Sequence, residues 1–170
     1  MPDEAIFGLV GVLLGSLTTS ILTIYKERLT TRHEAALRDL QYERERKSAR
    51  DAFQRDSIQT LQSAVSELIK SVYAELDRVL AITRESGKWP VRQWETPTAV
   101  GWSAAVLLLE SSRARVFDDE LRSLAAELRT VAGDCIWAKN LEEAKERSKR
   151  LEPLQIQFNE AAAELLPSLY

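Results

Sequence analysis

The stretch that decides the fold is IQTLQSAVSELIKSVYAELDRVL, residues 58–80. Its non-polar residues recur at spacings of three and four, which places them on one face of an α-helix. The resulting stripe is wide, as in a helix packed in a globular bundle rather than in a two-stranded coiled coil. Its members are Ile58, Leu61, Val65, Leu68, Val72, Leu76 and Val79, with Ile69, Tyr73 and Leu80 at its edges.

Toward the C-terminus, the sequence predicts further helices. Gly87 and Pro90 should end the first helix, because glycine favours the C-cap and proline cannot continue a helix. Thr96 is a candidate cap for a second helix that begins at Pro97, where a missing N–H costs nothing. Residues 96–109 contain no charge but are too few to cross a bilayer, so we expect a core helix. Its expected inner face is Val100, Ala104, Leu107 and Leu108.

Two more helical segments follow. Asp118 is a candidate cap for the first, and Asn140 with Glu143 forms a capping-box-like pair for the second, which Pro153 should kink or split. The expected buried positions are Leu121, Leu124, Ala125, Leu128, Val131, Ala132 and Cys135, then Leu141, Ala144, Leu151, Phe158, Ala162 and Leu165. No long alternation of polar and non-polar residues indicates a strand. Residues 58–170 are therefore expected to form an antiparallel bundle of about four helices.

Toward the N-terminus, residues 16–86 contain neither glycine nor proline, which predicts a long helix. Residues 26–57 would form a charged helical stalk. Leu29, His33, Ala36 and Leu40 have coiled-coil spacing, but the same spacing continues into polar residues. The sequence therefore predicts a stalk that is mostly solvated. The polar continuation is Glu43, Lys47, Arg50 and Gln54.

Residues 5–25, AIFGLVGVLLGSLTTSILTIY, carry no charge and are long enough to cross the roughly 30 Å core of a bilayer. Lys26, Arg28 and Arg32 follow them, whereas Asp3 and Glu4 precede them. Since positive residues stay on the cytoplasmic side, we expect one span in the cell (inner) membrane with residues 1–4 outside. The three basic residues should lie near lipid headgroups. A cleaved signal peptide fits less well, because the leader is acidic and the non-polar run is long.

The expected span has two overlapping stripes. Gly11, Gly15, Thr19 and Thr23 recur every fourth residue, a spacing of small residues that lets membrane helices approach closely. Hydroxyl groups at Ser16, Thr19, Ser20 and Thr23 could bond to a neighbouring helix in a dimer, line a narrow pore in a larger ring, or bond to carbonyls of their own helix.

Composition narrows the function. The formal net charge of −3 is unlike that of a nucleic-acid-binding domain. His33 is the only histidine and Cys135 the only cysteine, so a histidine metal cluster and an internal disulfide are both excluded. No phosphate-binding or nucleophile motif occurs. We therefore expect no enzyme, no cofactor and no metal site.

A loop over residues 87–95 precedes a cluster of aromatic residues. Trp89, Arg92, Trp94 and Trp102 could form a docking surface for a cytoplasmic protein, since tryptophan and arginine dominate interface hot spots. The alternative is that these tryptophans close the end of the bundle, with indole N–H groups bonded to backbone carbonyls.

The layout of the uncharged residues 5–25 and the Arg/Glu-rich residues 26–56 resembles that of uncharacterised bacterial single-pass membrane proteins with a small helical cytoplasmic domain. This resemblance implies no activity. Two hypotheses follow from the sequence. One is a self-associating, membrane-anchored scaffold or interaction protein. The other is a small oligomeric pore or membrane-perturbing effector, similar to holins or phage-defence proteins.

Overall fold

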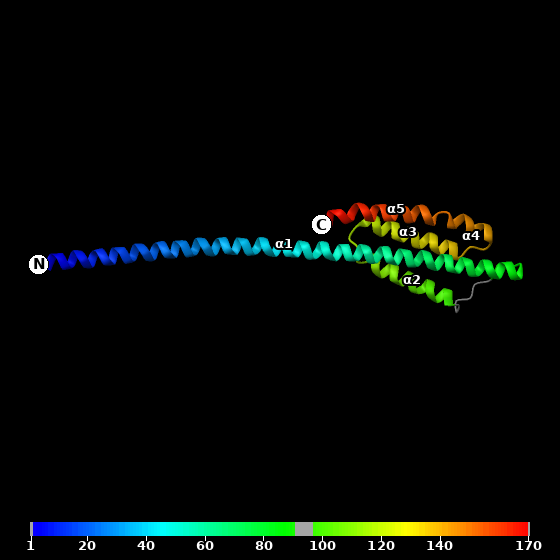
Figure 1. Ribbon diagram of the computed structural model, residues 1–170, viewed down its shortest axis with the longest axis horizontal. Helices are drawn as coiled ribbons and strands as arrows, with labels where there is room; N and C mark the ends of the chain where they lie inside the picture. The colour runs from blue at the N-terminus through cyan, green and yellow to red at the C-terminus, as the bar shows by residue number, and fades with distance from the viewer. Residues whose placement is uncertain (1, 91–96, 170) are drawn as a thin grey trace. The chain divides into compact units, whose positions relative to one another are not determined.

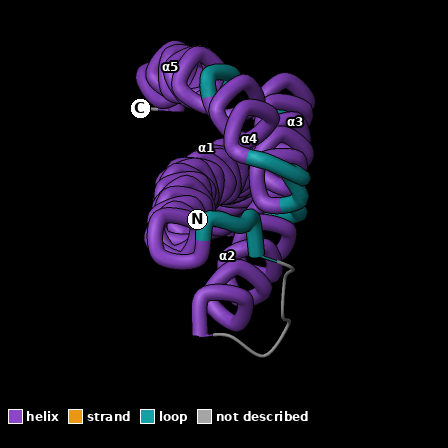
Figure 2. The backbone as a smooth tube through the Cα atoms, turned by 90° about the vertical axis from the view of Figure 1, so that its right-hand side faces the viewer, coloured by secondary structure: helices purple, strands orange, loops and turns teal. Residues whose placement is uncertain are grey.

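The computed structural model describes the backbone of residues 2–90 and 97–169. Within these ranges, side chains are described except for residues 2–25, 27, 29–33, 35, 36 and 97–99. Everything regular in this part of the chain is helical, which confirms the all-α class (Figure 2). The helices are α1 (Pro2–Ser86), α2 (Pro97–Arg113), α3 (Asp119–Ile136), α4 (Leu141–Ser148), α5 (Leu151–Leu165) and the 3-10 helix η1 (Leu166–Leu169).

The chain divides into two compact units, Met1–Ala49 and Arg50–Tyr170. In the first unit, every side chain that is described is exposed, including Leu37, Leu40 and Tyr42. This agrees with a solvated helix stabilised by local propensity and weak ion pairs such as Glu34–Arg38. The second unit begins at Arg50, so residues 50–57, which the sequence pattern placed in the stalk, belong to it.

The second unit is built on the stripe of residues 58–80. In Figure 1, its part of α1 is accompanied by α2, α3 and α5, and successive long helices run in alternating directions. Leu61, Leu68 and Val72 are fully buried, together with Leu109 of α2 and Phe158 of α5. Burial of each such side chain contributes about 1.5–3 kcal/mol, so this shared core supplies the main stabilisation of the unit.

The helix ends follow the expected local chemistry. Gly87 has a φ of 68° and its N–H donates to the Thr83 carbonyl at 2.9 Å, which ends α1. The Leu121 N–H donates to Asp118 at 2.8 Å, and the Glu143 N–H donates to Asn140 at 2.9 Å. The caps predicted at Asp118 and Asn140 are therefore confirmed, whereas Thr96 lies outside the described residues.

The last helical segment is divided, as Pro153 predicted. Helix α4 ends at Ser148 and α5 begins at Leu151, so proline occupies the first turn of a new helix. An N–H missing from the first turn leaves no intrahelical hydrogen bond unmade, whereas proline in a helix interior breaks one. Gly133 lies inside α3, which continues to Ile136.

The predicted inner face of α2 is wrong. Val100, Ala104, Leu107 and Leu108 are exposed, while Ala105, Leu109 and Ser112 face the core. The reason is that α2 carries no charge before Glu110, so hydropathy alone does not distinguish its two faces. Tyr73, placed at the edge of the α1 stripe, is also largely exposed.

Candidate functional site: the outer face of α2

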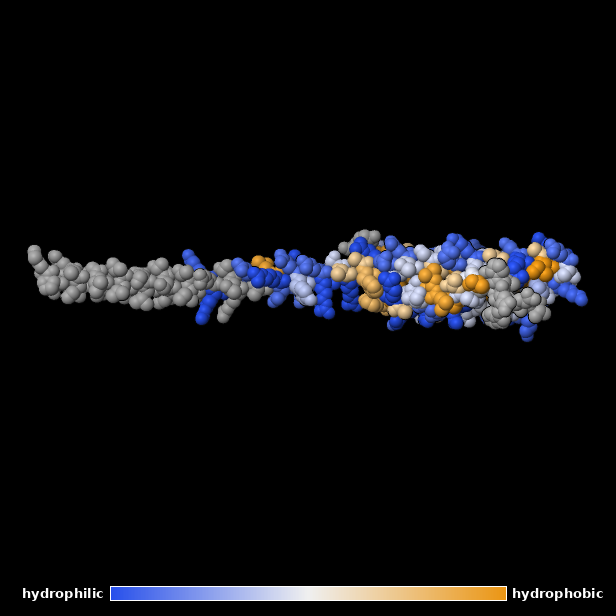
Figure 3. Space-filling view, turned by 90° about the horizontal axis from the view of Figure 1, so that it is seen from below, coloured by the Kyte–Doolittle hydropathy of each residue, from blue (hydrophilic) through white to orange (hydrophobic). Residues whose placement is uncertain are grey.

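Helix α2 presents a non-polar stripe to solvent. Its large members are 62% exposed at Val100, 71% at Leu107 and 43% at Leu108, and the exposed Ala104 lies between them. We call these four residues the outer stripe. Figure 3 shows the non-polar side chains gathered over α2. Single exposed leucines are ordinary, but several on one helix face mark an interaction surface.

A groove runs beside the outer stripe, between α2 and α1. It has a volume of about 400 Å³. Most of the α2 side is made of small residues, and a Cβ placed on Gly101 would meet nothing within 4 Å. The groove therefore has room for a side chain from outside. Its lining residues are Glu67, Lys70, Ser71 and Ala74 of α1 with Gly101, Ala104, Ala105 and Leu108 of α2.

The charges around this face are paired with each other. Lys70 contacts Glu67 at 2.7 Å on the groove wall. At the C-terminal end of α2, Glu110 contacts Arg113 at 2.6 Å and Arg129 of α3 at 3.3 Å. The Glu67–Lys70 pair carries no net charge, so two copies brought together at the groove would meet without like-charge repulsion from this pair.

A second feature lies on α1 near the beginning of the second unit. Gln54 is only 6% exposed; its side-chain amide donates to the Arg115 carbonyl at 3.1 Å and accepts from the Phe117 N–H at 2.9 Å. These bonds hold α1 to the turn between α2 and α3. The sequence pattern assigned Gln54 to the solvated stalk, which is wrong, because its amide satisfies two backbone groups of that turn.

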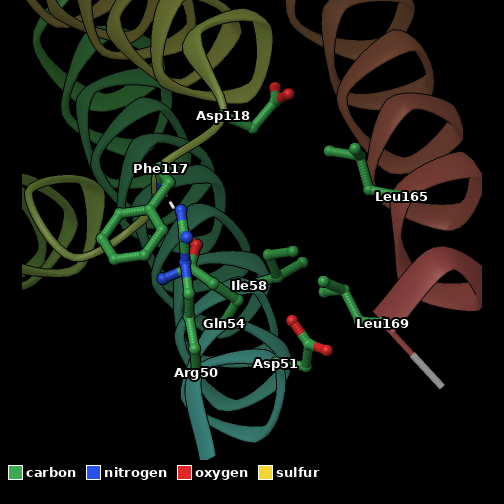
Figure 4. Close-up of a pocket in the computed structure, with 8 residues that line it drawn as sticks. All are labelled: Arg50, Asp51, Gln54, Ile58, Phe117, Asp118, Leu165 and Leu169. Carbon is green, nitrogen blue, oxygen red and sulfur yellow. Dashed lines mark hydrogen bonds between the residues drawn. The ribbon is translucent and has the colours of Figure 1, made fainter. Parts of the chain in front are cut away.

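Aromatic rings and arginines surround this junction. The Arg50 guanidinium lies 5.2 Å from the Phe117 ring centre, and the Arg115 guanidinium 5.3 Å from that of Phe53. A pocket of about 320 Å³ opens beside them (Figure 4). Its non-polar lining comes from Ile58, Leu165 and Leu169, and its charged rim from Arg50, Asp51 and Asp118.

The predicted tryptophan surface is described only in part. The Trp89 indole N–H donates to the Ala138 carbonyl at 3.0 Å, and Trp89 and Trp102 both pack on the core. For Trp89, this matches the alternative in which tryptophan closes the end of the bundle. Arg92 and Trp94 lie outside the described residues.

Most residues of the expected membrane span lie outside the described side chains. These are Gly11, Gly15, Ser16, Thr19, Ser20 and Thr23, as well as Arg32 of the expected headgroup set. Lys26 and Arg28 of that set are exposed. Among the side chains that the structure describes, no helix offers a stretch apolar and long enough to span a bilayer.

Cys135 is buried on the core face of α3. Burial, reinforced by the nearby Asp134 carboxylate, raises the pKa of the thiol to about 11. A thiol held in its neutral form is a poor nucleophile and a poor metal ligand. Within the described residues, no three His, Cys, Asp or Glu side chains are grouped as metal ligands.

The sequence contained a weak signal for the true orientation of α2. Ala105, Leu109 and Ser112 are also spaced by four and three, so the helix, which has no charge before Glu110, carries two alternative non-polar stripes. Comparison of the chain with protein-family models, with curated proteins and with solved structures finds no match.

Proposed function

We propose that this chain is a non-enzymatic, membrane-anchored scaffold that self-associates. Residues 5–25 would form the single span and residues 26–49 the stalk. The C-terminal part would be an antiparallel helical bundle presented in the cytoplasm. The observation that carries the proposal is the outer stripe, since a non-polar helix face left open on an otherwise completed core is typical of a protein-binding surface.

The anchor rests on separate support. Residues 5–25 are uncharged, and the exposed Lys26 and Arg28 follow them directly, as expected at a cytoplasmic membrane surface. The ridge of Gly11, Gly15, Thr19 and Thr23 would allow spans of different copies to pack closely. Anchoring also raises the local concentration of copies, so weak contacts between their cytoplasmic parts become effective.

The test is the mass of the intact protein in a mild detergent, measured by light scattering or native mass spectrometry. We expect a defined species with at least two copies, and recovery of the expressed protein with floated membranes. A strictly monomeric chain that captures no partner would contradict self-association. A chain that stays out of the membrane fraction would contradict the anchor.

The hydroxyl stripe of Ser16, Thr19, Ser20 and Thr23 favours a second candidate, an oligomeric pore or membrane-perturbing effector. Under this alternative, the double substitution Thr19→Leu/Thr23→Leu abolishes conductance across a bilayer. Under the scaffold proposal, the same variant changes only the association of the spans. Unchanged membrane potential on induced expression of the native chain would count against a pore.

A further inference from the structure

We infer that the outer stripe and its groove are the contact between two copies of this chain, with α2 of one copy lying antiparallel to α2 of the other. This inference rests on the proposed function. It names the surface of the second unit through which the copies associate. The partner is a second copy because the same face carries both a ridge, the exposed Leu108 side chain, and a matching hollow, the open space beside Gly101.

The positions on α2 fix how such a pair would fit. At 100° per residue, Leu108 and Gly101 lie on the groove side of the outer stripe, while Leu107 and Val100 lie on its opposite side. In an antiparallel pair related by a two-fold axis, residues on one side meet residues of the same side. If Ala104 faces its own equivalent, Leu108 of each copy lies over Gly101 of the other, and Leu107 lies against Val100.

Each of these contacts is sterically suited to its place. The open space beside Gly101 receives a leucine side chain, whose further neighbours would be Ser71 and Ala74 on the wall formed by α1. Ala104 at the centre is small enough to let the two helix axes approach to about 8 Å. A surface that supplies ridge and hollow in the same register is self-complementary, as a two-fold interface requires.

The electrostatic surroundings fit the same partner. Residues 100–109 of α2 carry no charge, and the flanking Glu67 and Lys70 neutralise each other on the groove wall. A strongly charged partner would find no complementary charge on this face, whereas a second copy brings the same neutral, non-polar surface. Because the contact uses a single helix and one groove wall of each copy, holding the copies in one membrane strengthens it.

The first test uses cysteine cross-linking in the full chain, reconstituted in lipid vesicles. Native Cys135 is buried, so an introduced cysteine is the main reactive thiol. Ala104→Cys should form a disulfide-linked dimer on mild oxidation, because self-facing residues bring their Cα atoms within about 7 Å. Ala163→Cys, on the exposed side of α5, is the matched control and should cross-link at least about tenfold more slowly. Equal rates for the two variants would overturn the inference.

The second test fills the hollow. Gly101→Leu should leave the single copy folded or more stable, because leucine has the higher helix propensity and its Cβ meets nothing. It should reduce cross-linking through Ala104→Cys by about tenfold or more. Gly133→Leu makes the same change at an open position of α3 and should leave cross-linking unchanged. If the native chain is oligomeric but neither Gly101→Leu nor Ala104→Cys reports on the contact, this interface is wrong and the scaffold proposal stands; a monomeric native chain contradicts both.

Discussion

The core stripe of α1 and the outer stripe of α2 are made of the same residue types at the same helical spacing, yet their environments are opposite. Leu61, Leu68 and Val72 of α1 have no solvent exposure, whereas Val100 and Leu107 of α2 are more than half exposed. The stripes themselves are alike. What differs is the side of each helix that lies opposite its stripe. In α1, the other side of the helix carries polar residues, among them the charged Glu67, Lys70 and Asp77, and these determine which face turns inward. In α2, no charge does so before Glu110.

The largest expected effect compares two leucines of α2 that lie two residues apart. Leu109→Ala should lower the free energy of unfolding by about 2–5 kcal/mol, because it opens a cavity in the core. Leu107→Ala should change the same quantity by less than about 0.5 kcal/mol, as is usual for an exposed position. Urea-dependent pulse proteolysis of the full chain, diluted in detergent until it is monomeric, measures both. Similar losses in the free energy of unfolding for the two variants would contradict the assignment of one leucine to the core and the other to the surface.

Burial in the core can be tested through the pH dependence of stability, because Cys135 is a buried titratable group. The folded state raises the pKa of this thiol from 9.0 to about 11, so folding favours the neutral form. The contribution to stability is complete below pH 9 and is lost as pH rises through 11. Two pKa units correspond to at most about 2.7 kcal/mol. Stability should therefore fall more steeply from pH 9 to 11 in the native chain than in Cys135→Ala, and parallel pH profiles would contradict this.

A smaller effect is expected at the junction where the core stripe begins. Gln54→Leu leaves the Arg115 carbonyl and the Phe117 N–H without their partner, which should cost about 1–3 kcal/mol. The matched control is Gln59→Leu on the exposed side of the same helix, where the cost should be near zero. Proteolysis within the α2–α3 turn should also become faster in Gln54→Leu only. An equal effect of both variants would show that the two hydrogen bonds contribute little.

The smallest effect concerns the first unit. Leu40 is 52% exposed, so Leu40→Ala should change stability by less than about 0.5 kcal/mol, although its spacing also suits a coiled-coil seam. The measurement is again pulse proteolysis, now of the oligomeric full chain. A cost of several times that size would reveal that Leu40 packs against another copy.

Much of the fold could be predicted from the sequence, because its signals are local. Gly87, Asp118 and Asn140 act through hydrogen bonds within a few residues, and Pro153 acts through its own ring. The core faces of α1 and α3 were also predictable, since charged residues mark their outer sides. Local chemistry of this kind does not depend on which helices later become neighbours.

The candidate site could not be predicted, because it depends on which neighbours each face of α2 acquires. The non-polar pattern of that helix is compatible with either face inward, and only packing against α1 and α3 selects one. The same holds for Gln54. Its polar side chain predicts exposure to water, but the amide instead forms hydrogen bonds with backbone groups of Arg115 and Phe117, which are distant in the sequence. Position within a pattern indicates burial only where the opposite face is unambiguously polar.

The open space beside Gly101 has a further consequence for experiment. If Leu108 of one copy occupies it, then Gly101→Leu fills the space with an added side chain, whereas Leu108→Ala removes the side chain that occupies it. Each would pair poorly with itself, but the two would pair with each other, since the added leucine meets the shortened side chain and the other contact stays native. Such an orthogonal pair would allow two differently tagged copies to be assembled in one membrane with a known composition.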